Sequence, residues 1–480
     1  MKSKIYAFAV LCMGVLMLSS CLKSNTDEVT YYEDTAITSF SLGTLNRYIQ
    51  TTTKAGVDTV IKTTLNAGSY KFNIDQRNRV IYNPDSLPKG VDATKVVINM
   101  TSKNSGALFI NKRTKDKMRD SLVYYSSNDS LDFTQPLEIR AFNNSGTAYR
   151  SYRVSVNVHK EDANVLNWQS VNGLDHLVAS MKGLRALAYD GKMWFMGNDG
   201  TGSRVYVGDY DDKQLIWTLA LEDVFDADAY RNFVLCCGYP MFLSNGKIYI
   251  IKKAGVGYEA TAIDAPNISL LLGGAYQSVY AYSKNGQLME SSYMSEVWKE
   301  VEMDRDREWL PTEDVNFVSL TSKTNDDVCK LVLLGNRNAQ QFAGETNAVI
   351  WSLVGETSTS GEKQPWTFYT VSPNSRQLLP RMKNLQVISY NNMLLAIGQN
   401  VIDASVSGGA VFYQSKNEGI AWQRDTVYAF PKDFTVTGSA FTVTTDENNY
   451  IWILAAETGE VWKGRLNELG WRKEQGAFEE

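Results

Sequence analysis

Few side chains in this 480-residue sequence have the type and spacing that catalysis or metal binding requires. Asp223, Asp226 and Asp228 lie close together in the string EDVFDADAY, and carboxylate oxygens are ligands that Ca²⁺ prefers. The string lacks the D-x-[DN]-x-[DN]-G order of a calcium loop, so it is interpreted as a solvated loop or a helix start. The only histidines, His159 and His176, form no H-E-x-x-H motif. The sequence therefore predicts no catalytic residue, metal site or cofactor, and it favours a non-enzymatic protein, with an enzyme as the alternative.

The cysteines do not form a disulfide scaffold. Apart from Cys12 and Cys21 near the N-terminus, the sequence contains only Cys236, Cys237 and Cys329, and three cysteines cannot all pair. The adjacent Cys236 and Cys237 are interpreted as two buried thiols, with a vicinal disulfide as the alternative. Cys329 follows the apolar pattern of a strand residue.

The N-terminus indicates export. A basic start, with Lys2 and Lys4, precedes an apolar run that is short for a membrane span but has the length of a signal-peptide core. The run ends in Leu-Ser-Ser-Cys21, which resembles a bacterial lipobox, where small residues precede the cysteine that receives a lipid. We therefore predict a lipoprotein signal peptide over residues 1–20 and lipidation at Cys21, which would attach the protein to a membrane. A short transmembrane anchor is the alternative.

Two domains are predicted after this signal. Residues 21–35 are polar and unpatterned, and they are interpreted as a lipidated tether. Residues 36–160 contain about seven short alternating segments separated by turn residues, which is typical of an antiparallel β-sandwich. The last segment, YRSYRVSVNVH, resembles the final strand of bacterial immunoglobulin-like domains. An immunoglobulin-like β-sandwich is therefore expected here.

Residues 161–480 repeat one theme, in which a tight polar turn leads into an apolar strand. The strings DGKMWFMGN, NGKIYIIKK, NNMLLAIGQN and NNYIWILAAE share this form. Asn-Gly and Asp-Gly favour tight hairpins because the turn needs positive φ. The turns recur at roughly 40 to 65 residues, the range of β-propeller blades. We predict an all-β chain that ends in a β-propeller of six blades, with five or seven as alternatives. Six tryptophans are expected to pack within or between blades: Trp194, Trp217, Trp351, Trp366, Trp452 and Trp462.

One further motif supports the propeller. Ser415, Asn417, Gly419 and Trp422 follow the spacing S-x-N-x-G-x-x-W. This resembles the Asp-box turn of sialidases and other propellers, with Asn in the Asp position, and the resemblance implies a kelch-like blade corner in which polar side chains bond to the loop backbone. Sialidases also carry an Arg-Ile-Pro segment, and the nearest string here, LPRM, does not match. The motif thus predicts architecture and no activity.

A second pattern concerns modification. The tripeptide D-[ST]-[AILVMT] resembles the O-glycosylation signal of secreted Bacteroidota proteins. It occurs more often than the one or two matches that average composition would give. The candidate hydroxyls are Thr35, Thr59, Ser86, Ser121, Ser130 and Thr426.

The complete pattern resembles a known family. A net charge of −5 without a basic stripe argues against nucleic acid as a partner. The lipobox, the tether, the immunoglobulin-like domain and the Trp-rich propeller together resemble an uncharacterised family of Bacteroidota lipoproteins with a domain of unknown function. The resemblance implies a lipoprotein of the outer membrane, on its periplasmic or cell-surface side. It transfers no catalytic residue.

Three functions are compatible with these observations. The first is a binding or scaffolding module in which the propeller engages a glycan or a protein, and carbohydrate binding would use exposed aromatic rings. The second is a propeller glycosidase or lyase that acts on extracellular polysaccharide. The third is a structural accessory subunit of an outer-membrane complex. A cluster of free carboxylates at the mouth of the propeller would favour the enzyme.

Overall fold

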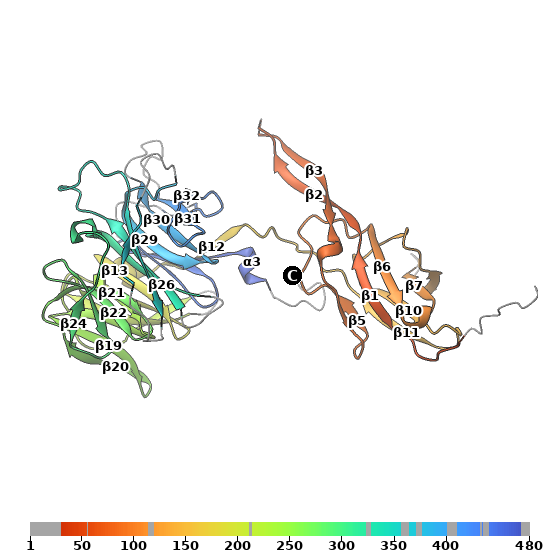
Figure 1. Ribbon diagram of the computed structural model, residues 1–480, viewed down its shortest axis with the longest axis horizontal. Coiled ribbons are helices and arrows are strands. Elements are labelled where there is room, and N and C mark those ends of the chain that lie inside the picture. The colour runs from red at the N-terminus through yellow and green to blue at the C-terminus, as the bar shows by residue number, and fades with distance from the viewer. Residues whose placement is uncertain are drawn as a thin grey trace, which may run out of the picture. The chain divides into compact units, whose positions relative to one another are not determined.

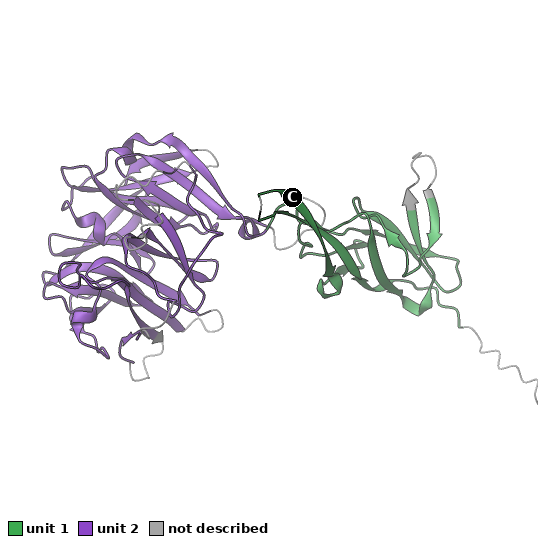
Figure 2. Cartoon of the chain, turned by 90° about the horizontal axis from the view of Figure 1, so that it is seen from above, with its two compact units in different colours: residues 1–162, 472–480 green, residues 163–471 purple. Residues whose placement is uncertain are grey.

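The computed structural model describes most of the chain after residue 29. The described residues are 30–54, 56–113, 120–210, 214–322, 328–356, 364–370, 377–400, 410–432, 434 and 441–471. Cys21, the predicted signal peptide and the first part of the predicted tether lie outside these ranges. Within them the chain forms two compact units, divided after Asp162 (Figure 2). Strands make up nearly all the regular structure, so the predicted all-β class is confirmed. None of the described helices has the length and apolar character needed to cross a bilayer.

Unit 1 is built from two sheets that share one hydrophobic core. The smaller sheet has the order β1-β6-β9 and the larger has the order β4-β5-β11-β10-β7-β8 (Figure 1). The strands are β1 (Ile37–Leu42), β4 (Asn73–Asp75), β5 (Val80–Tyr82), β6 (Val96–Ser102), β7 (Leu108–Arg113), β8 (Asp120–Tyr124), β9 (Ser130–Leu131), β10 (Leu137–Phe142) and β11 (Tyr149–Val154). The sequence predicted antiparallel pairing, but β5 and β11 pair in parallel. Such pairing needs a long connection, and here most of the domain lies between the two strands.

A two-stranded hairpin of β2 (Thr44–Thr52) and β3 (Asp58–Asn66) pairs with neither sheet and projects from unit 1 (Figure 1). Two single-turn 3₁₀ helices, η1 (Ala67–Ser69) and η2 (Lys103–Ser105), follow β3 and β6. The last residues of the predicted tether contact this unit. Tyr32 N donates to Asn144 Oδ1 at 2.8 Å, and Asp34 forms ion pairs with Lys103 and Arg150. Residues 30–35 therefore pack against the domain.

Unit 2 contains six four-stranded sheets, the number of blades that the sequence favoured. Blade 1 comprises β13 (Gly183–Tyr189), β14 (Lys192–Asn198), β15 (Ser203–Tyr210) and β16 (Leu215–Leu219); blade 2 comprises β17 (Val234–Cys236), β18 (Tyr239–Ser244), β19 (Lys247–Ala254) and β20 (Gly257–Asp264). Blade 3 comprises β21 (Ile268–Ala275), β22 (Ser278–Ser283), β23 (Leu288–Ser292) and β24 (Trp298–Glu300); blade 4 comprises β25 (Glu313–Thr321), β26 (Val328–Asn336), β27 (Val349–Glu356) and β28 (Thr367–Phe368). Blade 5 comprises β29 (Met382–Tyr390), β30 (Met393–Asn400), β31 (Ala410–Ser415) and β32 (Gln423–Arg424). The short helical turns α2 (His176–Ala179), η3 (Ala229–Asn232) and η4 (Arg307–Trp309) lie before the inner strands of blades 1, 2 and 4, and α3 (Asn467–Gly470) follows the last strand of the unit.

The ring is closed by strands from both ends of unit 2. Blade 6 takes β33 (Phe441–Thr445), β34 (Ile451–Ala455) and β35 (Glu460–Leu466) from the C-terminal side. Its fourth, outermost strand is β12 (Leu166–Leu174), which pairs antiparallel with β35. The first strands of successive blades contact one another around the ring, including β33 with β13. The pairing of β12 with β35 thus covers an edge of β35 that would otherwise remain unpaired, and it closes the ring of blades.

Apolar residues lie between the blades. Trp194, Trp351, Trp366 and Trp452 are each at most 1% exposed, as the blade-core prediction required. The predicted tight turns occur at Asp190-Gly191 and Asn245-Gly246, where all four residues have positive φ. Each turn reverses the chain within one blade, so the apolar strand that follows returns into the sheet.

Candidate functional site

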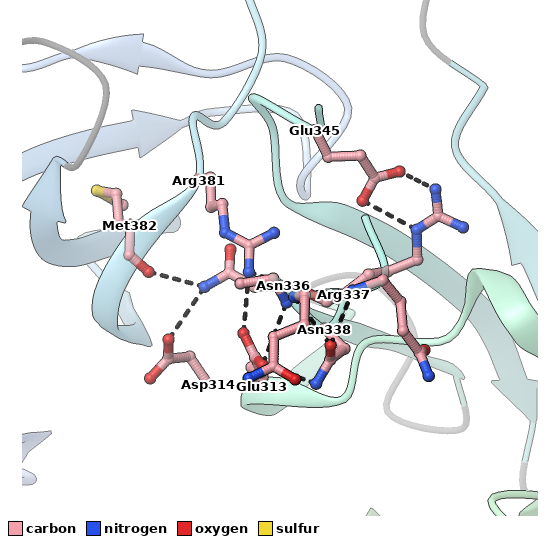
Figure 3. Close-up of polar contacts among 11 residues, drawn as sticks. Glu313, Asp314, Asn336, Arg337, Asn338, Glu345, Arg381 and Met382 are labelled. Carbon is pink, nitrogen blue, oxygen red and sulfur yellow. Dashed lines mark hydrogen bonds and ion pairs between the residues drawn. The ribbon is translucent and has the colours of Figure 1, made fainter. Parts of the chain in front are cut away.

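We define the upper end of the propeller as the end at which the inner strands of blades 1 to 6 begin, and the lower end as the opposite one. The upper end of blades 4 and 5 carries a cluster of charged and amide side chains (Figure 3). They come from the start of β25, from the end of β26 and the loop after it, and from the start of β29. We call this set the upper cluster: Glu313, Asp314, Asn336, Arg337, Asn338, Glu345 and Arg381.

Glu313 uses both carboxylate oxygens within the upper cluster. Oε2 accepts a hydrogen bond from Arg381 Nη2 at 2.9 Å, and Oε1 accepts from Asn338 Nδ2 at 3.2 Å and from Ala339 N at 3.3 Å. Arg381 also donates to the carbonyl oxygen of Arg337 at 2.8 Å. Glu313 therefore links blade 5 to the long loop of blade 4, and it is not a free base.

Arg337 is the most buried charge of the upper cluster, with a relative exposure of 5%. Its Nε donates to Glu345 Oε2 at 2.9 Å, and its Nη2 also pairs with Glu345. The guanidinium lies over two rings, 3.7 Å from the centroid of Phe342 and 4.2 Å from that of Trp309. A guanidinium held by a bidentate ion pair and by two aromatic faces has little freedom, so this part of the upper end is rigid.

Asp314 differs from the other carboxylates because burial raises its pKa to about 6. Its Oδ2 accepts a hydrogen bond from Asn336 Nδ2 at 3.0 Å, and the same Nδ2 reaches the carbonyl oxygen of Met382 at 2.7 Å. The backbone N–H of Asn384 also donates to the carboxylate. Among the groups of the upper cluster, Asp314 is the one that could exchange a proton near neutral pH.

The β-bulge that contains Asp314 in β25 has a counterpart in β29 of the next blade. In β25 the register shifts between Glu313 and Asn316, with Asp314 at φ 48°, and in β29 it shifts between Lys383 and Gln386, with Asn384 at φ 54°. Asp and Asn tolerate this left-handed conformation better than most residues. Such bulges re-aim side chains at the rim of a sheet.

Amide and hydroxyl side chains of the inner strands hydrogen-bond to the backbone of the next blade. Asn316 Oδ1 accepts from Val387 N at 2.9 Å, and Gln386 Oε1 accepts from Val443 N at 2.7 Å. A corresponding bond joins Thr442 to Ala186 N, and Asn232 at the end of η3 bonds to Leu271 N in the same way. These side chains satisfy backbone groups at the inner edges of the blades and tie the blades together.

Arg185 is the exception on the inner side of the ring. It lies on β13, deep within the propeller, yet it is partly accessible to solvent, and its Nη1 donates to the carbonyl oxygen of Arg231 at 3.0 Å. Among the described residues, no carboxylate lies within ion-pair distance of it. Burial lowers the pKa of Arg185, since its charge is not balanced there.

The Asp-box-like residues form a turn between β31 and β32 at the lower end. Gly419 N donates to Ser415 Oγ at 2.9 Å, and Ala421 N donates to Asn417 Oδ1 at 2.8 Å. Gly419 has φ 94°, and Trp422 is 2% exposed in the core between blades 4 and 5. The side chains of the turn are thus engaged with its own backbone and with the core.

The other candidate residues of the sequence do not assemble into a site. Asp223, Asp226 and Asp228 are exposed in the loop before η3, and Asp228 pairs with Arg231 at 3.4 Å. Within the described ranges, no three His, Cys, Asp or Glu side chains are grouped to bind a metal ion. Cys236, Cys237 and Cys329 form no disulfide bond within the described part of the chain.

The candidate glycosylation residues fall into two groups. Thr35 is 3% exposed and Ser86 is 5% exposed, and Thr35 Oγ1 donates to the carbonyl oxygen of Phe142 at 3.0 Å. A sugar on either hydroxyl would not fit into the folded domain. The hydroxyls that remain accessible, wholly or in part, are those of Thr59, Ser121, Ser130 and Thr426.

The sequence alone does not indicate the upper cluster or Arg185. Arg381 belongs to the LPRM string, which does not match the sialidase motif, and Glu313 and Asp314 stand in an ordinary polar string. A weak signal exists in the repeated forms E-D-V-N at 313–316 and K-N-L-Q at 383–386, which mark the two bulges.

The fold and the site define an all-β protein with a six-bladed propeller that follows a separate β-domain. The family described as "DUF6242 beta propeller domain" matches residues 162–474, and its N-terminal domain, described as a domain of unknown function, matches residues 40–156. The chain belongs to this family. No curated protein matches it.

Solved structures similar to this chain include enzymes and uncharacterised proteins. A carbohydrate-active enzyme of family AA12 from Trichoderma reesei is 7% identical, covers 63% of this chain and 96% of its own, and has a TM-score of 0.40. A protein of unknown function from Bacteroides thetaiotaomicron is 10% identical. The match covers 83% of this chain and 98% of that protein, with a TM-score of 0.39. A gluconolactonase from Xanthomonas campestris is 11% identical. The match covers 62% of this chain and 95% of that enzyme, with a TM-score of 0.34. At these TM-scores the likenesses carry no argument about function.

Proposed function

We propose that this protein is an outer-membrane lipoprotein, anchored through Cys21, whose propeller binds an anionic group of a glycan or protein partner and does not transform it. The lipobox-like string and the glycosylation-like tripeptides support the location. Arg185 carries the proposal for the propeller. In the same proposal, unit 1 is an immunoglobulin-like domain, and it acts as a spacer between the lipid and the propeller.

A guanidinium that lies deep in the propeller, with no carboxylate partner among the described residues, is costly unless something else compensates its charge. Arg185 makes one hydrogen bond to a backbone carbonyl and keeps part of its surface accessible. Its planar fork would take a carboxylate or sulfate in two parallel hydrogen bonds. By contrast, the carboxylates of Glu313 and Glu345 are already paired with arginines. This arrangement suits binding better than acid–base turnover.

The test uses the full mature chain with Cys21→Ser to keep it soluble. It is applied to a glycan array and to affinity gels that contain acidic or neutral polysaccharides, with product analysis on every hit. We expect binding of an acidic ligand without products, and at least a tenfold loss of affinity in R185Q, since a charge-assisted pair contributes about 1.5 to 3 kcal/mol.

R305Q is the matched control. Arg305 is exposed at the upper end, stacked 4.9 Å from the centroid of Phe368. Undiminished binding by R185Q would refute the role of Arg185. Failure of the wild-type chain to bind any glycan or isolated protein partner would leave the structural accessory subunit as the better explanation.

One observation favours an enzyme as the second candidate. The pKa of Asp314 is raised to about 6, which is suitable for a general acid or base in a glycosidase or lyase. If this function is correct, polysaccharide turnover will follow a pH profile with an apparent pKa near 6. D314N will then abolish turnover while leaving ligand binding intact. Binding without products from any polysaccharide would rule this candidate out.

A further inference from the structure

The lower end of blade 2 contains two adjacent cysteines in a tight turn. Cys236 ends β17 and pairs with Tyr239 at the start of β18, so Cys237 and Gly238 form a two-residue hairpin loop. Both loop residues have positive φ, 51° for Cys237 and 79° for Gly238. Such loops favour Asn, Asp or Gly at both positions. A cysteine in the left-handed region costs roughly 1 to 2 kcal/mol, so its presence there calls for an explanation other than turn formation.

The turn brings the two thiols together. Cys236 Sγ and Cys237 Sγ are 3.6 Å apart, and Cys237 Sγ is 3.7 Å from the carbonyl oxygen of Ser278 on blade 3. Gly274 leaves the space that the Cys236 thiol occupies, because a Cβ at that position would lie 2.5 Å from Cys236 Sγ. Rotation of the side chains over a short distance would bring the sulfurs to the roughly 2.05 Å of a disulfide bond.

We propose that Cys236 and Cys237 are a redox-active pair that forms a reversible vicinal disulfide by thiol–disulfide exchange with a disulfide-bearing oxidant, either a small molecule or another protein.

The two thiols have different roles in this exchange. Cys236 is 1% exposed, whereas Cys237 is half-buried and can be reached from solvent. The hydrogen bond between the thiols lowers the pKa of Cys237 and raises that of Cys236, which burial raises further. The thiolate, and not the thiol, attacks a disulfide. Cys237 is therefore the attacking residue and Cys236 the resolving one.

The exchange balances in two steps. Cys237 loses its proton to solvent, and its thiolate attacks one sulfur of the oxidant, which forms a mixed disulfide and releases the other sulfur as a thiolate. Cys236 then attacks the Cys237 sulfur, the vicinal bond forms, and the second half of the oxidant leaves with the proton of Cys236. Two protein thiols are oxidised, and one disulfide is reduced to two thiols.

The product is expected to be readily reduced. Adjacent Cα atoms across a trans peptide are about 3.8 Å apart, which is shorter than the roughly 4.4 to 6.8 Å of ordinary disulfides. A bond formed under this constraint is strained, and strained disulfides have the more oxidising potentials of regulatory or catalytic pairs. The pair thus suits a switch more than a structural cross-link.

The experiment equilibrates the folded mature chain carrying Cys21→Ser with mixtures of oxidised and reduced glutathione. After acid quenching, alkylation and trypsin digestion, mass spectrometry follows the peptide of residues 232–247, which contains both cysteines. In oxidising mixtures we expect this peptide to carry no alkyl group and to be two hydrogens lighter than the unalkylated dithiol form, independently of protein concentration. In reducing mixtures we expect it to carry two alkyl groups. Excess reduced glutathione is expected to reverse the change completely.

Three variants separate the roles. C236S is expected to accumulate glutathione on Cys237, because the resolving thiol is missing, whereas C237S is expected to remain unmodified because Cys236 is buried. C329S, which changes a thiol 2% exposed on β26, is expected to oxidise like the parent. The proposal is overturned if the parent gives only the glutathione adduct or an intermolecular dimer. It is also overturned if the parent stays reduced in every mixture, or oxidises only after denaturation.

Discussion

The two ends of the propeller are packed with different kinds of side chain. At the upper end of blades 4 and 5, charged side chains are matched within the upper cluster, as Arg337 with Glu345 and Arg381 with Glu313. At the lower end of blades 2 and 3, aromatic rings and thiols take their place. Tyr239 and Tyr293 stack at 5.9 Å, and the Lys252 ammonium lies over both rings.

The two ends are expected to differ in how much a changed side chain destabilises the protein. A matched buried ion pair is sensitive to the loss of one partner, because the remaining charge is left in a poor solvent. A cation over tyrosine rings near water contributes less and can be rearranged at little cost. The upper end of blades 4 and 5 is thus rigid, whereas the lower end of blades 2 and 3 can accommodate a change such as oxidation of Cys237.

The largest effect is expected for R337M. The substitution keeps much of the side-chain volume between Phe342 and Trp309 but removes the partner of Glu345. We expect the free energy of unfolding to fall by about 3 kcal/mol, measured by urea denaturation. R305M removes an exposed stacked guanidinium and is expected to cost less than about 1 kcal/mol. Equal effects of the two substitutions would contradict the interpretation that this end is rigid.

The sequence predicted the propeller and its six blades because each blade repeats its own local signals. Asn245-Gly246 favours a tight hairpin turn through its own two residues, and strings such as KMWFMGN are apolar on both faces. The upper cluster has no such local signature. Glu313 and Arg381 are 68 residues apart and meet only because two inner strands begin at the same end of the ring. No local sequence pattern indicates Arg185 either, because its position deep within the propeller depends on closure of the ring.

The second effect is a pH dependence from Asp314. Burial raises its pKa from 3.8 to about 6, so the fold favours the protonated acid. This stabilisation is fully present below pH 3.8 and is lost as the pH rises through about 6, above which the folded protein contains a buried carboxylate. The side chain of D314N is neutral at every pH. We therefore expect its free energy of unfolding to be about 1 to 2 kcal/mol higher than that of the parent at pH 8, and equal to it at pH 4. D223N, at an exposed position of the same end, controls for net charge.

A smaller effect is expected at the Asp-box-like turn of the lower end. N417A removes the acceptor for Ala421 N and is expected to cost about 1 kcal/mol in thermal or urea unfolding. N417D restores the residue that the motif usually carries and keeps the acceptor, so its stability should lie within about 0.5 kcal/mol of the parent. If N417D destabilised the protein as much as N417A, the side chain would act through its amide nitrogen and not through Oδ1.

The smallest effect is expected for K252M, which keeps the apolar stem of the lysine but removes the ammonium that lies over the rings of Tyr239 and Tyr293. We expect a loss of about 0.5 kcal/mol, because the half-buried site leaves the cation largely hydrated. K253M, at the exposed neighbouring position, is the matched control and should leave the free energy of unfolding unchanged. A loss in K252M as large as that in R337M would mean that the lower end depends on its cation as strictly as the upper end does. In that case, movement of the Cys236–Tyr239 turn on oxidation would destabilise the whole of blade 2 and not only rearrange its surface.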